Sequence, residues 1–149
     1  MIIKTLKDPK KPGLQKIKTT DLPKLSILVI DDNSDLLDLQ KTILGMEGFE
    51  VFTAQSGREA IQVLAEIEEP DLILLDMQLQ DMTGSTFLLV LEKKMSRVLK
   101  NVPVVFHSAM DQVPMGKAVG FIRKNAKIDE FLCSVHRFMK VRQSVHYQH

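Results

Sequence analysis

Short apolar runs alternate along this chain with longer segments in which apolar residues recur at helical spacing. The runs cover residues 25–30, 49–52, 72–75, 102–106 and 120–123. Runs of this length, rich in Ile, Leu and Val, are typical of strands buried in a parallel sheet. The segments with helical spacing are residues 34–47, a stretch from Ser56 to just before Pro70, and residues 85–99 and 128–140. This alternation predicts an α/β fold with a doubly wound parallel sheet and right-handed crossovers.

The first expected helix has clear end signals and one obvious apolar stripe. Asn33 or Ser34 can cap its start, and Gly48 can stop its end. The residues of the stripe are Leu36, Leu39, Ile43 and Met46. Because these residues are spaced three or four apart, we expect the stripe to face the sheet.

Composition indicates one ordinary globular domain. The chain has 149 residues, 44% of them hydrophobic and 26% charged, and no apolar run approaches the roughly 18 residues of a membrane span. No apolar stretch follows the first lysines, so we expect no secretory signal. Cys133 is the single cysteine, which excludes an intrachain disulfide and suits a reducing, cytoplasmic location. On its helix it is expected to be a small core residue.

The positive charge is concentrated at the start of the chain. Residues 1–24 hold seven lysines against Asp8 and Asp21, a net charge of +5, which leaves −4 for the rest. Prolines and a glycine interrupt this segment, so we expect a basic, mobile arm over 1–24, a domain over 25–140 and a tail over 141–149. The arm could bind nucleic acid, membrane or an acidic partner. We favour a solubilising role, because no aromatic residues lie between the lysines.

Acidic residues stand where two of the expected strands end. Asp31 and Asp32 follow the first strand, and Asp76 follows the run 72–75. The carboxyl ends of parallel strands are where ligands bind in open α/β sheets, so these carboxylates should share one crevice. Carboxylates held that close raise one another's pKa unless a cation lies among them. Hard oxygen ligands in a half-open site suit Mg²⁺.

Two further strand ends add a hydroxyl and an ammonium group. Ser108 follows the run 102–106 by two residues, and Lys124 follows the run 120–123. These are groups that can stabilise the oxygens of a transferred phosphoryl group. His107 could point into the core or toward the site, and we treat it as structural. The spacing of the histidines does not favour zinc.

Taken in order, Asp31-Asp32, Asp76, Ser108-Ala109 and Lys124 resemble the receiver domain of bacterial two-component response regulators. The resemblance covers about residues 24–139. It implies the flavodoxin-like strand order 2-1-3-4-5. It also implies that Asp76 is the phosphoacceptor, and that Asp31, Asp32 and Asp76 bind Mg²⁺ with the backbone carbonyl of Gln78. Ser108 and Lys124 would contact the phosphoryl oxygens, and Phe121 would be the aromatic switch residue.

The function implied by this resemblance is a phosphoacceptor signalling switch. Its donor would be a histidine kinase or a histidine phosphotransfer protein, and its output a protein–protein contact rather than nucleic-acid binding. The domain would catalyse only its own phosphorylation and dephosphorylation. The alternative is a receiver-like interaction module that works without phosphorylation. A phosphatase ranks last, because Gln78 stands where a second catalytic acid would be needed.

The chain departs from the receiver pattern in three places. Asn125 follows Lys124 where a proline is usual, and Gln80 replaces a frequent proline after Asp76. Only fifteen residues separate Ser108 from Lys124, and they include Pro114 and Gly116. We therefore expect the receiver's fourth helix, between the fourth and fifth strands, to be shortened to about one turn or missing. The dimer that receivers build from that helix should then be weak, and signalling should use the face around Asp76, the first helix and Phe121.

Overall fold

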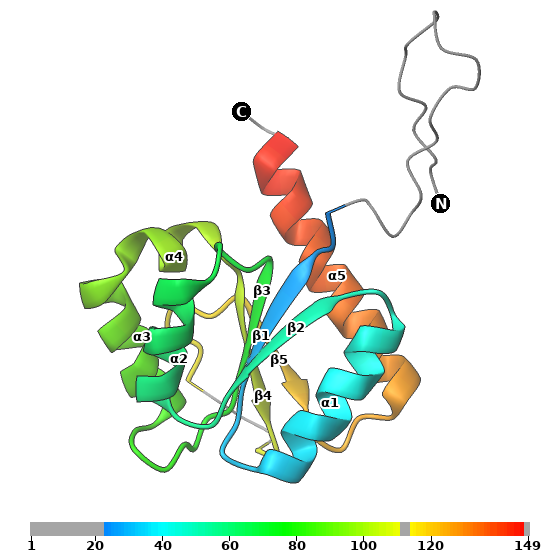
Figure 1. The fold of residues 1–149 in the computed structure, drawn as a ribbon, viewed down its shortest axis with the longest axis horizontal. Helices are drawn as coiled ribbons and strands as arrows, with labels where there is room; N and C mark the ends of the chain where they lie inside the picture. Colours follow the sequence, from blue (N-terminus) through cyan, green and yellow to red (C-terminus); the bar gives the residue numbers. More distant parts are fainter. Residues whose placement is uncertain (1–22, 111–113, 148–149) are drawn as a thin grey trace, which may run out of the picture.

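The structure, a computed structural model, describes residues 23–110 and 114–147. Five parallel strands form one sheet in the order β2-β1-β3-β4-β5 (Figure 1). The strands are β1 (Ser26–Ile30), β2 (Glu50–Ala54), β3 (Leu72–Leu75), β4 (Val104–Ser108) and β5 (Gly120–Arg123). The predicted α/β class and strand order are confirmed. The three strands in the middle of the order are β1, β3 and β4, and all of their residues are buried, as their continuous apolar runs indicated.

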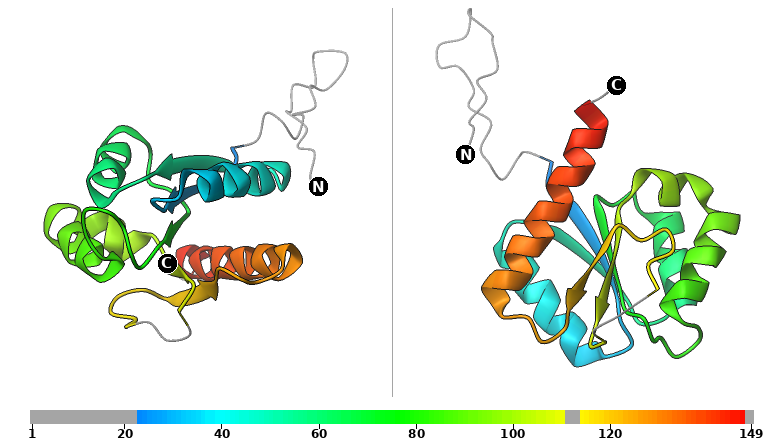
Figure 2. Two further views of the ribbon diagram at one scale, coloured as in Figure 1. Left: turned by 90° about the horizontal axis from the view of Figure 1, so that it is seen from below. Right: turned by 180° about the vertical axis from the view of Figure 1, so that it is seen from behind.

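Helices cover both faces of the sheet. The helices are α1 (Ser34–Met46), α2 (Gly57–Glu66), α3 (Gly84–Lys94), α4 (Ser96–Asn101) and α5 (Ile128–Tyr147). In Figures 1 and 2, α1 and α5 lie on one face, and α2, α3 and α4 lie on the other. One apolar cluster fills the α2–α3–α4 side and a second fills the α1–α5 side. The result is a three-layer sandwich whose loops lie at the two ends of the strands.

Local signals set the starts of the first two helices and the end of α1 as the sequence predicted, whereas α2 ends at Glu66, before the expected limit at Pro70. The Asn33 side chain accepts a hydrogen bond from Leu36 N at the start of α1, and Ser56 accepts one from Glu59 N at the start of α2. Just after α1, Gly48 has a φ of 94°, a left-handed conformation that a side chain would disfavour.

The face that α1 turns toward the sheet differs from the expected one. Its buried residues are Leu37, Gln40 and Leu44. By contrast, Leu39 is 53% exposed and Met46 is 82% exposed, and Leu36 and Ile43 are half-buried, so the expected stripe lies beside the buried face rather than on it. Both sets recur at helical spacing, and spacing alone does not say which of two neighbouring stripes meets the sheet. The helix therefore has a buried stripe and an exposed apolar stripe.

Two other expected helices have different ends. The helix expected over 85–99 is interrupted at Met95, where φ is −143° and ψ is 56°, so that α3 and α4 are separate. The last helix continues to Tyr147, past the expected end near Lys140 and into the segment assigned to a tail. Cys133 on α5 is exposed, contrary to the expected core position.

The link between β4 and β5 contains no helix among its described residues, which are 109–110 and 114–119. Residues 111–113 lie outside the described part of the chain. The short α4 precedes β4 and does not replace the missing element. The expectation of a shortened or missing fourth helix is confirmed over the residues described. The expected basic arm lies almost wholly in residues 1–22, which are not described, and none of the described helices is long and apolar enough to cross a membrane.

Candidate functional site

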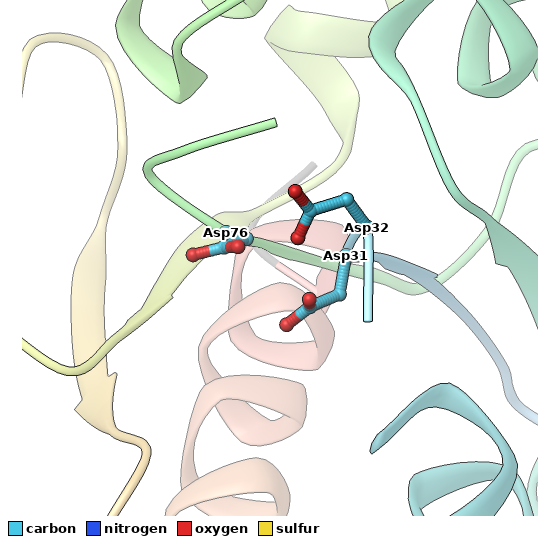
Figure 3. A group of neighbouring side chains, drawn as sticks. All are labelled: Asp31, Asp32 and Asp76. Carbon is cyan, nitrogen blue, oxygen red and sulfur yellow. The ribbon is translucent and has the colours of Figure 1, made fainter. Parts of the chain in front are cut away.

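Three carboxylates meet at the carboxyl edge of the sheet (Figure 3). Asp31 and Asp32 follow β1, and Asp76 follows β3, the strand paired with β1. Backbone hydrogen bonds position both strand ends, since Asp31 N donates to Ala54 O at 3.0 Å and Asp76 N donates to Ile30 O at 2.9 Å. The ligand oxygens of the three side chains lie within 4.8 Å of one another. The sequence prediction that these residues converge is confirmed in geometry.

Burial and like charge act together on Asp76. Burial, and then the negative charge of Asp31, raise the pKa of the Asp76 carboxyl above its ordinary value. The charge of Lys124, its hydrogen bond and the Gln78 N–H act in the opposite direction. The environment therefore disfavours the ionised form of Asp76 unless additional positive charge is supplied.

Lys124 supplies part of that charge. Its Nζ lies 2.8 Å from Asp31 Oδ2 and 3.2 Å from Asp76 Oδ2. Burial lowers the pKa of Lys124, but the bonds and charges of Asp31 and Asp76 outweigh burial and raise it overall. The ammonium group is therefore charged at neutral pH and lies between the two buried carboxylates.

The donor set fits a divalent cation. Asp31 is 1% exposed and Asp76 is 7% exposed, whereas Asp32 faces solvent and leaves one side of the group open. With all three carboxylates ionised, one ammonium leaves two negative charges uncompensated. Oxygen ligands with an open side are what Mg²⁺ uses, because it keeps water or phosphate oxygens in its remaining positions.

Ser108 and Lys124 are joined through the backbone. Ser108 is buried at the end of β4, and its carbonyl accepts a hydrogen bond from Lys124 N at 2.8 Å. Its hydroxyl oxygen accepts from Met110 N at 3.0 Å. Phe121 pairs with Phe106 in the β4–β5 register and is half-buried. The hydroxyl and the aromatic ring thus belong to the adjacent strands β4 and β5, and the Lys124 ammonium follows β5 directly.

The loop after Asp76 is tightly folded. Gly84 N donates to Met77 O at 2.7 Å, and Gln78 pairs with Thr83 as an antiparallel bridge. The Gln78 N–H hydrogen-bonds the Asp76 carboxylate. This bonding holds the Gln78 backbone beside the acceptor side chain.

Asp81 in this loop was not identified from the sequence. Its two carboxylate oxygens accept hydrogen bonds from Gly57 N and Arg58 N at the start of α2. Burial raises the pKa of Asp81, but the N–H groups of Arg58 and Gly57 outweigh burial and hold it below its ordinary value. The bonded residues are more than twenty positions apart, so no local motif indicates the contact.

His107, the residue before Ser108, points into the core. Its Nδ1 lies 2.9 Å from Gln40 Nε2 on α1, and both side chains are buried. Burial, and then the charge of Lys124, lower the pKa of His107 to about 4, so the ring is neutral at pH 7. The structural interpretation of His107 agrees with this placement.

Comparison with known proteins identifies relatives over most of the chain. The model of the family described as "Response regulator receiver domain" matches residues 27–136. Sporulation initiation phosphotransferase F of Bacillus subtilis (strain 168) is 29% identical over 124 residues, which are 79% of this chain and 96% of that protein.

Two solved structures share the fold. The signal receiver domain of a putative Luxo repressor protein from Vibrio parahaemolyticus has a TM-score of 0.72 and 26% identity, over 84% of this chain and 97% of that one. Response regulator protein TrrA from Thermotoga maritima, in complex with Mg²⁺ and BeF, has a TM-score of 0.66 and 25% identity, over 76% of this chain and 98% of that one.

Proposed function

Because the chain belongs to the response regulator receiver domain family, we propose that Asp76 is the acceptor of a phosphoryl-controlled signalling switch. The observation that carries this proposal is the placement of Asp76. It lies at the end of a central strand, 3.2 Å from the Lys124 ammonium and within 4.8 Å of Asp31 and Asp32. A buried carboxylate beside an ammonium and a cation-binding group is suited to attack on phosphorus.

The chemistry is transfer from a phosphohistidine to the Asp76 carboxylate. A carboxylate oxygen forms a P–O bond, the P–N bond of the donor breaks, and its electron pair returns to the imidazole ring. Because the transition state is loose, positioning and charge stabilisation do most of the work. Lys124 balances charge on the phosphoryl oxygens, and Ser108 reaches one of them with its hydroxyl.

We propose that Mg²⁺ is the cation of this site. Asp31, Asp32 and Asp76 would hold it together with the backbone carbonyl of Gln78. Bound there, Mg²⁺ neutralises charge on the carboxylates and on the phosphoryl oxygens. The complex of TrrA with Mg²⁺ and BeF supports the assignment by similarity.

Phosphorylation would change the contacts of Ser108. Its hydroxyl now accepts from Met110 N. Donating to a phosphoryl oxygen would draw Ser108 toward Asp76 and alter the start of the link after β4. Phe121, on the neighbouring strand, would respond to that movement. A local charge would thereby shift the population between two backbone arrangements.

The exposed stripe of α1 is the proposed docking face for the phosphodonor. Leu39 and Met46 are strongly exposed, Leu36 and Ile43 are half-buried, and the helix begins directly after the Asp31–Asp32 pair. An apolar stripe beside the acceptor suits a helix of a histidine kinase or phosphotransfer protein. For the location we propose the cytoplasm, because a chain with a single cysteine forms no intrachain disulfide and suits a reducing compartment.

The acceptor is tested by intact mass after incubation with Mg²⁺ and acetyl phosphate. The wild type should gain one phosphoryl group and Asp76→Asn should gain none. Asp38→Asn, which changes an exposed acid on α1, is the matched control and should label normally. Labelling of Asp76→Asn, or a wild type that no donor labels, would favour the phosphorylation-independent interaction module.

The metal is tested by Mg²⁺ titration of two variants. Asp32→Ala should weaken binding more than Asp31→Ala, because Asp32 is the exposed ligand and Asp31 already pairs with Lys124. Equal affinity of Asp32→Ala and wild type would remove Mg²⁺ from this site.

The docking face is tested with a phosphorylated phosphotransfer domain that labels the wild type. Leu39→Glu should slow this transfer about tenfold or more and leave labelling by acetyl phosphate unchanged, since loss of a central interface contact costs about 2 kcal/mol. Leu89→Glu changes a similarly exposed leucine on α3. This variant should accept the phosphoryl group at the wild-type rate. Equal rates for the two variants would rule out α1 as the docking face.

A further inference from the structure

We propose that Asp81 is a positioning residue of the phosphoryl-accepting site. Its carboxylate fastens the loop after Asp76 to the start of α2 and so fixes the Gln78 backbone beside the acceptor. The inference rests on the proposed function, because it concerns the same metal and acceptor.

The attachment uses both oxygens of Asp81. Oδ1 accepts from Gly57 N at 3.0 Å and Oδ2 accepts from Arg58 N at 2.9 Å. The first N–H groups of a helix have no partner within the helix, so they are available to a side chain from elsewhere. The helix dipole also favours a carboxylate at this end. The helix has its own cap as well, since Ser56 Oγ accepts from Glu59 N.

Packing next to Asp81 reinforces the attachment. A Cβ added to Gly57 would lie 2.5 Å from Met82 Sδ, so the missing side chain of Gly57 leaves room for Met82. Met82 belongs to the apolar cluster under α2 and α3. Polar and apolar contacts of consecutive residues thus hold the same loop against the same helix end.

The attachment reaches the site through the hydrogen bonds of the loop. Leu79 N donates to Met82 O at 3.0 Å, and Gln78 bridges to Thr83. The Gln78 N–H in turn bonds the Asp76 carboxylate. Gln80 in the middle of the loop is exposed and, unlike proline, does not fix its own φ. The position of Gln78 therefore depends on the contacts that flank Gln80, and Asp81 makes the hydrogen bonds among them that reach α2.

The test compares Asp81→Ala with Ser56→Ala in Mg²⁺ titrations followed by amide NMR shifts. Both variants remove a cap from α2, but only Asp81→Ala releases the loop. Asp81→Ala should weaken Mg²⁺ affinity about tenfold, as is typical when an outer partner of a metal ligand is lost. Ser56→Ala should bind as the wild type does. Urea unfolding establishes that both variants are folded.

A second measurement needs no metal. Hydrogen exchange of the Gln78 amide should be faster in Asp81→Ala than in wild type and Ser56→Ala, because its bond to Asp76 opens more often. Unchanged exchange in Asp81→Ala would overturn the inference, as would equal losses of Mg²⁺ affinity in the two variants. If the wild type itself bound no Mg²⁺, the proposed function would lose its cation, and the exchange result alone would decide the role of Asp81.

Discussion

The ends of β3 and β4 lie side by side at the same edge of the sheet, but the chain leaves them in different ways. After β3, residues 77–83 are closed by three ties: the Gly84–Met77 and Leu79–Met82 backbone hydrogen bonds, and the Asp81 contacts with α2. After β4, the described part of the link has hydrogen bonds from Met110 to Ser108, from Ala118 to Met115 and from Val119 to Val104, and one exposed ion pair with α3. The acceptor side of the site is thus held from several directions. The hydroxyl side is held by backbone bonds within the β4–β5 pair, including the one from Lys124 N to Ser108 O, and by an exposed ion pair with α3.

The difference matches the two tasks of the site. An acceptor must keep its carboxylate and ligands in place before the donor arrives, because misplacement costs rate. A residue that reports the phosphoryl group must have a second arrangement available to it. At the end of β4, the side chain held by buried contacts is His107, the residue before Ser108. Gln40 and Phe131 contact its ring.

The largest expected effect concerns that buried ring. The pKa of His107 is about 4 in the folded protein and about 6.5 in an unfolded chain. As pH falls, the unfolded chain takes up the proton on His107 before the folded protein does. The stability that the neutral ring contributes is therefore fully present above pH 6.5 and is lost as pH falls toward 4. Two and a half pKa units correspond to about 3 kcal/mol. Between pH 7 and pH 4, the free energy of unfolding should fall by about 3 kcal/mol less in His107→Leu than in wild type. Urea unfolding at the two pH values measures both changes. Equal losses would show that the ring is charged or exposed in the fold.

The next effect concerns the loop after β3. A Cβ on Gly84 would lie 2.7 Å from Asp76 O and 2.9 Å from Phe106 Cε1, and the first of these is backbone. Gly84→Ala should lower the free energy of unfolding by about 2 kcal/mol, within the usual range for overpacking. It should also slow phosphorylation of Asp76.

Gly45→Ala is the control for this change. Gly45 lies in α1 with nothing within 4 Å of an added Cβ, so the variant should be stabilised by about 0.5–1 kcal/mol. If thermal or urea unfolding showed the two alanine variants to be equally stable, the loop after β3 would be less tightly packed than its contacts indicate.

A smaller effect is expected in the link after β4. Lys117 Nζ lies 2.7 Å from Glu92 Oε1 on α3, and both side chains are substantially exposed. Lys117→Ala should cost no more than about 0.5 kcal/mol, because exposed ion pairs are screened by water. A loss above about 2 kcal/mol in urea unfolding would mean that this ion pair holds the link firmly, and the contrast between the two strand ends would disappear.

No change at all is expected in the association state. The described part of the link contains no helix, so the surface that would support a helix-mediated dimer is incomplete. Light scattering should give a monomer with and without Mg²⁺ and beryllofluoride. A dimer that forms with beryllofluoride and is lost on mutation of residues 114–119 would show that the link is an interface after all.

The convergence of Asp31, Asp32, Asp76 and Lys124 could be predicted because each follows an apolar run. In a parallel sheet, residues that follow the strands reach the same edge whatever the loops do. The missing helix after β4 could be predicted from the few residues available and from Pro114 and Gly116 among them. The break at Met95 was missed, since residues 85–99 continue a helical pattern through it.

The sequence by itself determined the strands, the caps of the first two helices and the residues at the carboxyl edge, because period, chain length and turn chemistry act between near neighbours. The tertiary structure decided which stripe of α1 is buried, since Leu37 and Leu39 belong to equally regular patterns and only packing selects one. It also decided that Asp81 bonds α2 and that Gln40 meets His107, 67 residues away. Such contacts depend on where folding places whole elements, and no local pattern of residues encodes that.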